Sequence, residues 1–333
     1  MSAPVIVTGA AGFIGYHLAC RLEGDGPVIG YDSRTRAAVN WWAVDAVCRR
    51  SGGYLVRADV TDGGAFRQAL TESGARLVYH LAAESHVDAS IAVPIEAMRT
   101  NALGTMAVAE ECARAGVPLV YASTDEVYGD LLGTPWADYG AVEDETPLRP
   151  SSPYSAGKAA GEMAVQAACR TSGLRALVTR ASNGFGPCQV PEKLLPIACA
   201  RLARGEPVPL HGGGSQVRQW VAVEEMAEAF AILGGLVPEH GWRAVNIGGP
   251  VLASVRDVVL ALASEACVAP DRAVVDAPDR PGQDRLYHVF RPTGHSPLSF
   301  ARRRVTDGAE LRALLDAYSG VRDEQPADYR SRT

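Results

Sequence analysis

The sequence lacks most of the features that mark secreted, membrane-bound or metal-binding proteins. Only seven of its 333 residues are cysteines, and no two of them form a C-x-x-C pair. An odd number of scattered cysteines argues against a disulfide framework and against a zinc site, and it indicates reduced thiols in the cytoplasm. No apolar run approaches the roughly 20 residues that a membrane-spanning helix needs. We therefore expect a cytoplasmic protein without a membrane segment or a metal.

An excess of positive charge is also missing. The 32 basic residues are outnumbered by 38 acidic ones, which gives a formal net charge of −6. No basic stripe of the kind that binds nucleic acid is visible. A strand begins directly after residues 1–3, so we expect no signal peptide. Because 47% of the residues are hydrophobic, the chain can form a large core in one or two lobes.

The N-terminal motif predicts a dinucleotide site. An apolar strand over residues 4–8 is followed by a turn with Gly9, Gly12 and Gly15, and then by a helix to about residue 22. The free N–H groups and the dipole of such a helix N-terminus suit a pyrophosphate. The spacing is G-x-x-G-x-x-G rather than the usual G-x-G-x-x-G. An ordinary tight turn is therefore the alternative at this point.

Asp32 supports the dinucleotide interpretation. It ends the second predicted strand about twenty residues after the turn, where an acidic residue accepts a hydrogen bond from the adenosine ribose. A carboxylate at this place repels a 2′-phosphate, so NAD is favoured over NADP. Arg34 and Arg36 lie close by in the sequence and leave NADP as an alternative.

Strands and helices alternate over the first half of the chain. This alternation predicts a Rossmann-type, doubly wound parallel sheet, with a smaller C-terminal α/β lobe after it. The predicted domains are residues 1–181 for NAD binding, with the catalytic residues, and 182–320 mainly for the substrate, followed by a disordered tail at 321–333. Two long helices are predicted over 94–115 and 154–171, a loop over 182–187, and a strand of the smaller lobe over 244–248.

A hydroxyl and two carboxylates follow the fifth predicted strand. Thr124, Asp125 and Glu126 come just after an apolar run that ends at residue 122. Ligands bind at the carboxyl ends of strands in such sheets. Adjacent carboxyl groups in different surroundings can provide one acid and one base, because burial or a like charge raises one pKa. The alternative is a solvated pair in a loop.

Tyr154 and Lys158 are four residues apart on a predicted helix, so they share one face. The charge of an ammonium favours a phenolate, so we expect Tyr154 to ionise more easily and to act as a base for an alcohol proton. An ordinary amphipathic helix face is the alternative. Combined with the carboxyl pair, these residues suggest a redox reaction coupled to an elimination.

On these motifs the chain resembles the extended short-chain dehydrogenase/reductase family, and within it the dTDP-glucose 4,6-dehydratases. The resemblance extends to about Asp284. The segments that carry it are the glycine turn at 9–15 and residues 81–88, 123–129, 150–158, 191–194, 218–220, 246–249 and 279–282. The Thr-Asp-Glu triplet is the specific part, because related 4-epimerases and decarboxylases generally lack the Asp-Glu pair.

The resemblance implies a reaction in which the cofactor is used and restored. Tyr154, aided by Lys158 and Thr124, would take the proton of the sugar 4-hydroxyl while NAD oxidises C4. The ketone acidifies C5, so that Glu126 would remove the C5 proton and Asp125 would protonate the departing C6 hydroxyl. Return of the hydride to C6 would give a 4-keto-6-deoxy sugar nucleotide, as in the biosynthesis of deoxysugars in secondary metabolism.

The motifs and the resemblance together imply two sets of binding residues. The expected NAD-binding residues are Gly9, Gly12, Phe13, Ile14, Gly15, Asp32, Asp59, Val60, Leu81, Ala82, Ala83, Ser85, Asn101, Tyr154 and Lys158. The expected substrate-binding residues are His86, Asn183, Glu192, Lys193, Arg218, Asn246 and Arg280. Some have plainer alternatives: a helix cap for Asp59, a surface ion pair for Glu192 and Lys193, and a surface position for the two arginines.

The chain departs from the family pattern mainly on the substrate side. The departures are Ala89 for Arg, Gly184 for Asn, Cys188 for an aromatic residue, Gln189 for an aromatic residue or His, and Gln283 for His. We therefore expect a sugar-nucleotide substrate that need not be dTDP-glucose. The alternatives are a nucleotide-sugar 4-epimerase and a non-enzymatic NAD-sensing protein. Family members commonly form dimers through the helices that match 94–115 and 154–171, so we expect a homodimer.

Overall fold

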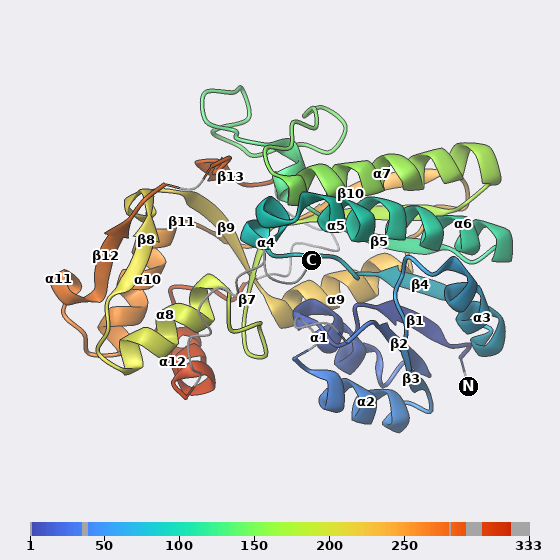
Figure 1. The fold of residues 1–333 in the computed structure, drawn as a ribbon, viewed down its shortest axis with the longest axis horizontal. Coiled ribbons are helices and arrows are strands. Elements are labelled where there is room, and N and C mark those ends of the chain that lie inside the picture. The colour runs from blue at the N-terminus through green and yellow to red at the C-terminus, as the bar shows by residue number, and fades with distance from the viewer. Residues whose placement is uncertain (1, 35–38, 280, 291–301, 321–333) are drawn as a thin grey trace.

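The computed structural model describes residues 2–34, 39–279, 281–290 and 302–320. Two parts lie side by side: a large sheet with helices on both faces, and a smaller lobe that carries most of the C-terminal elements (Figure 1). The predictions for Arg36, Arg280 and the tail at 321–333 lie outside the described residues.

The large sheet has seven strands in the order β10-β6-β5-β4-β1-β2-β3, all parallel to their neighbours. The order from β3 to β6 is that of a dinucleotide-binding doubly wound sheet, so the predicted fold class is confirmed. The strands are β1 (Val5–Thr8), β2 (Val28–Asp32), β3 (Tyr54–Arg57), β4 (Leu77–His80), β5 (Leu119–Thr124), β6 (Ala176–Ala181) and β10 (Trp242–Ile247).

Helices cover both faces of this sheet, and alternate residues of each strand point to opposite faces. Val5 and Val7 of β1 pack on one side, while Ile6 between them packs on the other. The first face is covered by α1 (Phe13–Leu22), α2 (Trp41–Arg50) and α9 (Val223–Gly234). The second face is covered by α3 (Gly63–Ser73), α6 (Thr105–Ala115) and α7 (Pro153–Ser172).

The helix predicted over 94–115 is interrupted. It consists of α5 (Pro94–Met98), a π-helical turn η1 (Arg99–Gly104) and then α6, and the short α4 (Val87–Ala92) precedes it. Asn101 lies in the π turn and is fully buried. Its side chain accepts a hydrogen bond from the backbone N–H of Glu84 (2.8 Å) and donates to the carbonyl of Glu84 (2.9 Å). Through these two bonds Asn101 holds the loop that follows β4 in place.

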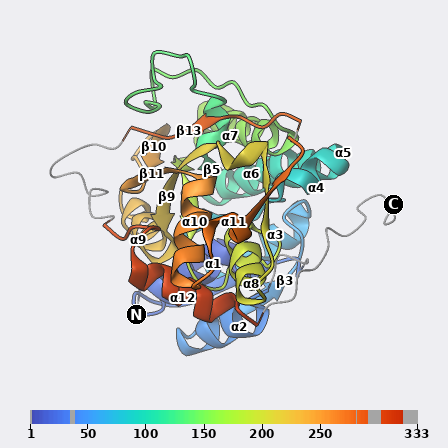
Figure 2. The ribbon, with the colours of Figure 1, turned by 90° about the vertical axis from the view of Figure 1, so that its left-hand side faces the viewer.

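The smaller lobe has its own core. Its strands are β7 (Asn183–Phe185), β9 (Val217–Ala222), β11 (Val251–Ser254) and β13 (Leu286–Tyr287) in one sheet, with β8 (Val208–His211) and β12 (Val274–Ala277) in a second. Its helices are α8 (Leu194–Ala203), α10 (Val255–Glu265), α11 (Pro270–Ala273) and α12 (Gly308–Tyr318), with the one-turn η3 (Gly212–Gly214). Figure 2 views the molecule from the side of this lobe, with α8, α10 and α12 in front of the large sheet.

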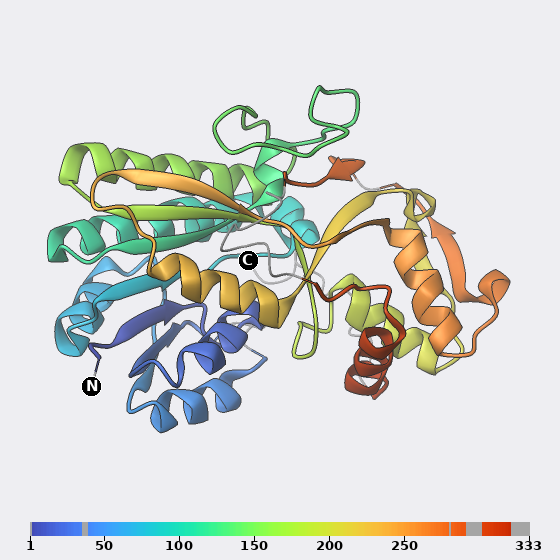
Figure 3. The ribbon, with the colours of Figure 1, turned by 180° about the vertical axis from the view of Figure 1, so that it is seen from behind.

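Two assignments after residue 181 are corrected by this topology. The loop predicted over 182–187 contains β7, which pairs with β9. The strand predicted at 244–248 in the smaller lobe is β10, which pairs with β6 at the edge of the large sheet. The chain returns to that sheet through α9, which packs against α1, as the view from behind shows (Figure 3). Residues 223–247 therefore belong structurally with the first part.

The segment over 130–150 is attached to the segment after residue 284. Leu131 donates its N–H to the carbonyl of Leu286 (3.1 Å), and Ala141 forms a bridge with Val289. Within the described part of the chain, no helix combines the length and the apolar character that crossing a lipid bilayer requires.

Candidate active site

A cavity of about 580 Å³ opens between the carboxyl edge of the large sheet and the smaller lobe. All five predicted catalytic residues line it: Thr124, Asp125, Glu126, Tyr154 and Lys158. Of the other predicted cofactor residues, those that line it are Gly9, Gly12, Phe13, Ile14, Gly15, Asp32, Asp59, Val60, Leu81, Ala82, Ala83 and Ser85. Among the predicted substrate residues, it is lined by His86, Asn183, Glu192, Lys193 and Arg218.

The glycine turn leaves backbone donors at the cavity. Gly12 is the N-cap of α1 and has no side chain with which to cap the helix. A Cβ on Gly15 would lie 2.1 Å from the carbonyl oxygen of Gly9, so only glycine allows the helix to approach the turn this closely. The arrangement fits the pyrophosphate of a dinucleotide.

Asp32 lies at the end of β2, with 8% of its surface exposed. Its carboxylate accepts hydrogen bonds from the N–H groups of Ala11 (3.0 Å) and Arg34 (2.9 Å), while burial raises its pKa. The guanidinium of Arg34 lies over the rings of Trp41 and Trp42, 5.4 and 5.3 Å from their centroids. Asp32 thus lines the cavity while the guanidinium of Arg34 stacks on aromatic rings. These residues fit NAD.

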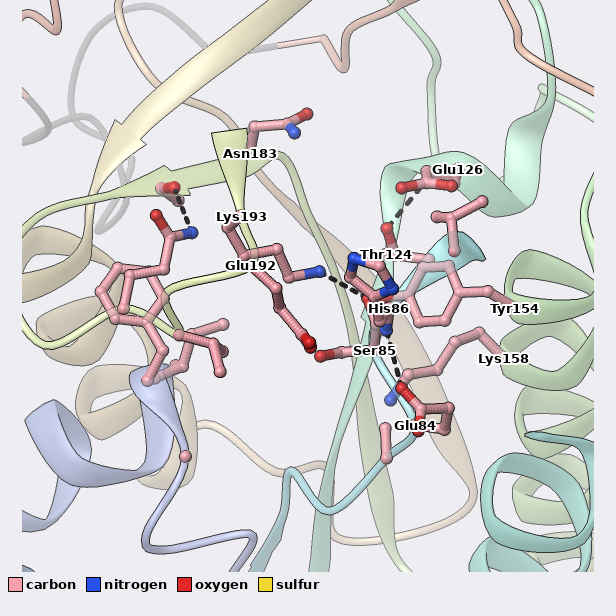
Figure 4. A pocket seen from close by; sticks show the side chains of 18 of the residues that line it. Glu84, Ser85, His86, Thr124, Glu126, Tyr154, Lys158, Asn183, Glu192 and Lys193 are labelled. Atoms are coloured by element: carbon pink, nitrogen blue, oxygen red, sulfur yellow. Dashed lines mark hydrogen bonds between the residues drawn. The ribbon is translucent and has the colours of Figure 1, made fainter. Parts of the chain in front are cut away.

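Tyr154 and Lys158 reach the cavity from α7 (Figure 4). Lys158 donates to the carbonyl of Ala122 across 2.7 Å, and burial lowers its pKa to about 7 although the charge of Glu162 opposes this. Burial also raises the pKa of Tyr154, and the charge of Glu126 raises it further, against a hydrogen bond with Thr124. The expectation that Tyr154 ionises more easily is therefore wrong for the protein alone, because burial outweighs any help from the ammonium.

Asp125 and Glu126 form the first turn of a short 3₁₀ helix, η2 (Asp125–Tyr128). Asp125 is 3% exposed, and its Oδ2 has no hydrogen-bond partner among the described residues. Burial, and then the charge of Glu126, raise the pKa of Asp125 to about 7, while Arg218 opposes the shift. Glu126 is partly exposed; burial raises its pKa as well, against the charges of Arg218 and Lys193. This pair suits one protonated acid and one base.

The smaller lobe provides the opposite wall. Lys193 donates to the carbonyl of Ser85 across 2.6 Å, which links that wall to the loop after β4 (Figure 4). Arg218 donates to the carbonyl of Asp284 (2.8 Å), and its guanidinium lies 4.2 Å from the ring centroid of Tyr287. The hydroxyl of Tyr287 donates to the carboxylate of Asp284. A cation and two further polar groups thus face Glu126.

Asp284 and Tyr287 line the cavity, but the sequence analysis did not select them. Asp284 marks the end of the family resemblance, and Tyr287 belongs to no motif. Their one signal in the sequence is their position shortly after the segment 279–282, in which Arg280 was predicted to contact the substrate.

Two of the predicted site residues that the structure describes do not line the cavity. Asn101 acts on the site through the backbone of Glu84. Asn246 lies on β10, and its side chain accepts from the hydroxyl of Tyr128 (2.9 Å) and donates to the carbonyl of Ala141 (2.8 Å). It lies behind η2 because β10 belongs to the large sheet.

Asp59 accepts from the N–H of Thr61 (2.8 Å), while Asp62 caps α3.

Three of the five departures from the family pattern line the cavity: Gly184, Gln189 and Gln283. A Cβ on Gly184 would lie 3.2 Å from the ring of Phe13, so a larger residue there would crowd the cofactor turn. Ala89 is buried in the first turn of α4, and the backbone of Cys188 is left-handed, with φ of 65°.

Comparison with known proteins agrees with this geometry. The model of the NAD dependent epimerase/dehydratase family matches residues 5–248. A dTDP-glucose 4,6-dehydratase of Streptomyces griseus is 38% identical over 307 residues, which cover 90% of each chain. The structure of a dTDP-glucose 4,6-dehydratase from Streptomyces venezuelae, with NAD bound, has a TM-score of 0.83 at 33% identity, and the match covers 95% of this chain and 96% of the other.

An enzyme of different activity has a similar structure. The UDP-glucose 4-epimerase of Thermus thermophilus, in complex with NAD, has a TM-score of 0.78 at 30% identity, and the match covers 96% of this chain and 99% of the other. The fold alone therefore does not separate a dehydratase from an epimerase. On the family model and the curated relatives, the chain belongs to the NAD-dependent epimerase/dehydratase family, the extended short-chain dehydrogenase/reductases to which its motifs pointed.

Proposed function

We propose that this protein is an NAD-dependent nucleotide-sugar 4,6-dehydratase, which converts a hexose nucleotide into a 4-keto-6-deoxy sugar nucleotide with loss of water. One observation carries the proposal. Asp125 and Glu126 lie in the first turn of η2 and line the same cavity as Tyr154 and Lys158. An enzyme that only oxidises and reduces C4 has no use for an acid and a base beyond the phenol.

The first proton transfer falls to Tyr154. Its oxygen accepts the proton of the sugar 4-hydroxyl, and its hydrogen bond with Thr124 favours the ionised phenol that this requires. Lys158 fixes the helix that carries Tyr154 through its bond to Ala122. NAD, when bound, supplies the acceptor for the hydride of C4 and later the donor to C6. The residues that would hold it are those of the glycine turn, Asp32 and the loop after β4.

The elimination falls to the carboxyl pair. Once C4 is a ketone, the proton at C5 is acidic, and Glu126 removes it. Asp125 gives a proton to the C6 oxygen, which leaves as water. The pKa of about 7 keeps much of Asp125 protonated near neutral pH, as a general acid requires. The partly exposed position of Glu126 in the lining of the cavity suits the base.

The substrate that we propose is a nucleoside diphosphate hexose. The two dehydratases named above act on dTDP-glucose by their names, and Arg218 offers a guanidinium for a diphosphate. Because Gly184, Gln189 and Gln283 replace bulkier or different family residues at the cavity, we propose a different preferred base or sugar. The test is mass analysis of products from a panel of dTDP-, UDP-, GDP- and CDP-hexoses, without added NAD. Loss of one water supports the dehydratase. Turnover of dTDP-glucose far above every other substrate would reject the altered preference.

The proposal includes a homodimer. Four large apolar side chains are exposed on the face formed by α5, η1, α6 and α7: Ile95 (71%), Leu103 (60%), Met106 (50%) and Met163 (47%). A second copy of this chain would cover these side chains, in a dimer that uses the same helices as the dimers of the family. Light scattering tests this: we expect Leu103→Glu to give monomers and Leu252→Glu, in the smaller lobe, to leave dimers. A monomeric wild type would reject the dimer.

The proposed setting is deoxysugar biosynthesis in the cytoplasm, with a role in secondary metabolism. All seven cysteines are free thiols in the structure, which suits a reducing compartment.

A further inference from the structure

A fully buried ion pair lies behind the carboxyl pair. Arg180 of β6 and Glu162 of α7 are 2.7 Å apart, with side-chain exposures of 4% and 0%. Glu162 also accepts a hydrogen bond from the hydroxyl of Ser123 (2.5 Å). Buried ion pairs contribute little net stability, since desolvation of the charges offsets their attraction. A role in fixing geometry is the better explanation for such a pair.

Arg180 extends this pair to η2. Its second terminal nitrogen donates to the hydroxyl of Tyr128 (2.8 Å) and to the carbonyl of Glu143 (3.0 Å). The hydroxyl of Tyr128 in turn donates to Asn246 (2.9 Å). Tyr128 is the last residue of η2, and Asp125 is the first. The two ends of this short helix are therefore the catalytic acid and a residue held by Arg180.

The other end of the network lies on the catalytic helix. Tyr154, Lys158 and Glu162 are spaced by four residues along α7, so they follow one another on one face. Ser123 directly precedes Thr124 at the end of β5. The chain of contacts from Ser123 to Asn246 thus connects the helix of the phenol with the helix of the carboxyl pair.

A helix as short as η2 has little stability of its own. The cap by Thr124, which accepts from the N–H of Glu126 (3.3 Å), and the bond from Gly129 N–H to the carbonyl of Glu126 (3.2 Å) hold only its two ends in place. Contacts from outside must therefore define its orientation.

We propose that Glu162, Arg180, Tyr128 and Asn246 form a positioning network that orients Asp125 and Glu126 toward the sugar, and that its loss impairs removal of water more than oxidation of C4. None of these four residues lines the cavity, so they act through η2 and not on the substrate. The inference rests on the proposed function and deepens it, because it assigns the geometry of the elimination to residues outside the cavity.

The test compares Tyr128→Phe with the control Tyr79→Phe. The control also removes the hydroxyl of a buried tyrosine, but on strand β4 and outside the network. Three quantities are measured: deuterium exchange from solvent at C5, the single-turnover rate of C4 oxidation, and the Tm of the protein without ligands. We expect Tyr128→Phe to slow C5 exchange about ten-fold and C4 oxidation less than about two-fold. Tyr79→Phe leaves both rates unchanged. The pH dependence of C5 exchange also shifts in Tyr128→Phe, since the surroundings of the carboxyl pair change.

The other possible results would overturn either the positioning network alone or the proposed dehydratase function with it. If wild type exchanges C5 normally, and Tyr128→Phe is either unaffected or slowed equally in both steps, the network has no special role in the elimination. If wild type shows no C5 exchange at all, the proposed function fails and the inference fails with it. Should Tyr128→Phe not fold, Asn246→Ala removes the acceptor of the same hydroxyl. It must then show the same selective loss, and equal slowing of both steps overturns the inference.

Discussion

The ammonium of Lys158 donates to the carbonyl oxygen of Ala122 across 2.7 Å, two residues before Thr124. This bond joins α7, which carries Tyr154, to the strand that delivers Thr124, Asp125 and Glu126. It also keeps the buried lysine next to an acceptor, although burial lowers its pKa to about 7. Lys158, which belongs to the same motif as Tyr154, thus holds the phenol close to the carboxyl pair.

Replacing Lys158 by methionine tests this arrangement. Lys158→Met keeps most of the side-chain volume but removes the charge and the donor. We expect the rate of C4 oxidation to fall about 100-fold or more, because Tyr154 then acts as a general base without the neighbouring ammonium and without the bond that fixes its helix. Single-turnover kinetics, with circular dichroism as a check of folding, measures the effect. Oxidation within about two-fold of wild type would show that the lysine is only a packed core residue.

Replacing Asp125 by asparagine separates a dehydratase from an epimerase. Asn keeps the shape of the side chain but has no proton to give to the C6 oxygen. We expect formation of the 4-keto-6-deoxy product to fall about 100-fold, while oxidation of C4 stays close to wild type. In the wild type, the same acid role predicts that the elimination slows as the pH rises through about 7. An epimerase would be almost insensitive to Asp125→Asn.

The raised pKa of Asp125 has a consequence for stability. In the fold its pKa is about 7, above the value of 3.8 for a free side chain. The folded protein therefore binds this proton more tightly than the unfolded chain, and stability is lost as the pH rises from about 4 through 7. We expect the free energy of unfolding of Asp125→Asn at pH 8 to exceed that of wild type by about 4 kcal/mol, which corresponds to a Tm about 6 °C higher. Near pH 4 the two should unfold at the same temperature; a gain that is equal at both pH values would contradict a buried charge.

The glycine turn is tested with two alanine variants. In Gly15→Ala the new methyl group meets the carbonyl of Gly9 at 2.1 Å, so α1 must move away from the turn. We expect a loss of NAD affinity of about ten-fold or more by calorimetry, with a lower Tm. Gly24→Ala, just after α1, is the matched control because nothing lies within 4 Å of its Cβ. Unchanged NAD binding in Gly15→Ala would mean that the turn does not hold the pyrophosphate.

The sequence predicted the large sheet well because its inner strands are continuous apolar runs bounded by turns. It placed β10 in the wrong part, since nothing local in residues 242–247 shows that this strand returns to β6 after an excursion through the smaller lobe. The π turn at Asn101 was also missed, because the local sequence suits an unbroken helix and the interruption depends on contacts with Glu84 and Thr105.

The sequence predicted those site residues that belong to recognisable motifs. It missed those that reach the cavity only through the tertiary fold. The glycine turn, the Thr-Asp-Glu triplet and the Tyr-Lys pair all reach one cavity. Asp284 and Tyr287 join it only through the fold of the smaller lobe. The ionisation of Tyr154 was predicted in the wrong direction, because a pattern of spacing reveals the neighbouring ammonium but not the depth of burial. Asn246 was selected by its motif, yet it lies in the layer behind the carboxyl pair.

The most direct measurement follows one deuterium atom. A hexose nucleotide that the enzyme turns over is labelled with deuterium at C4, and the product is analysed by mass spectrometry and NMR. A 4,6-dehydratase gives a product lighter by one water, with the deuterium at C6 and a ketone at C4. A product of unchanged composition, with the deuterium still at C4 of an inverted centre, would contradict the elimination and identify an epimerase.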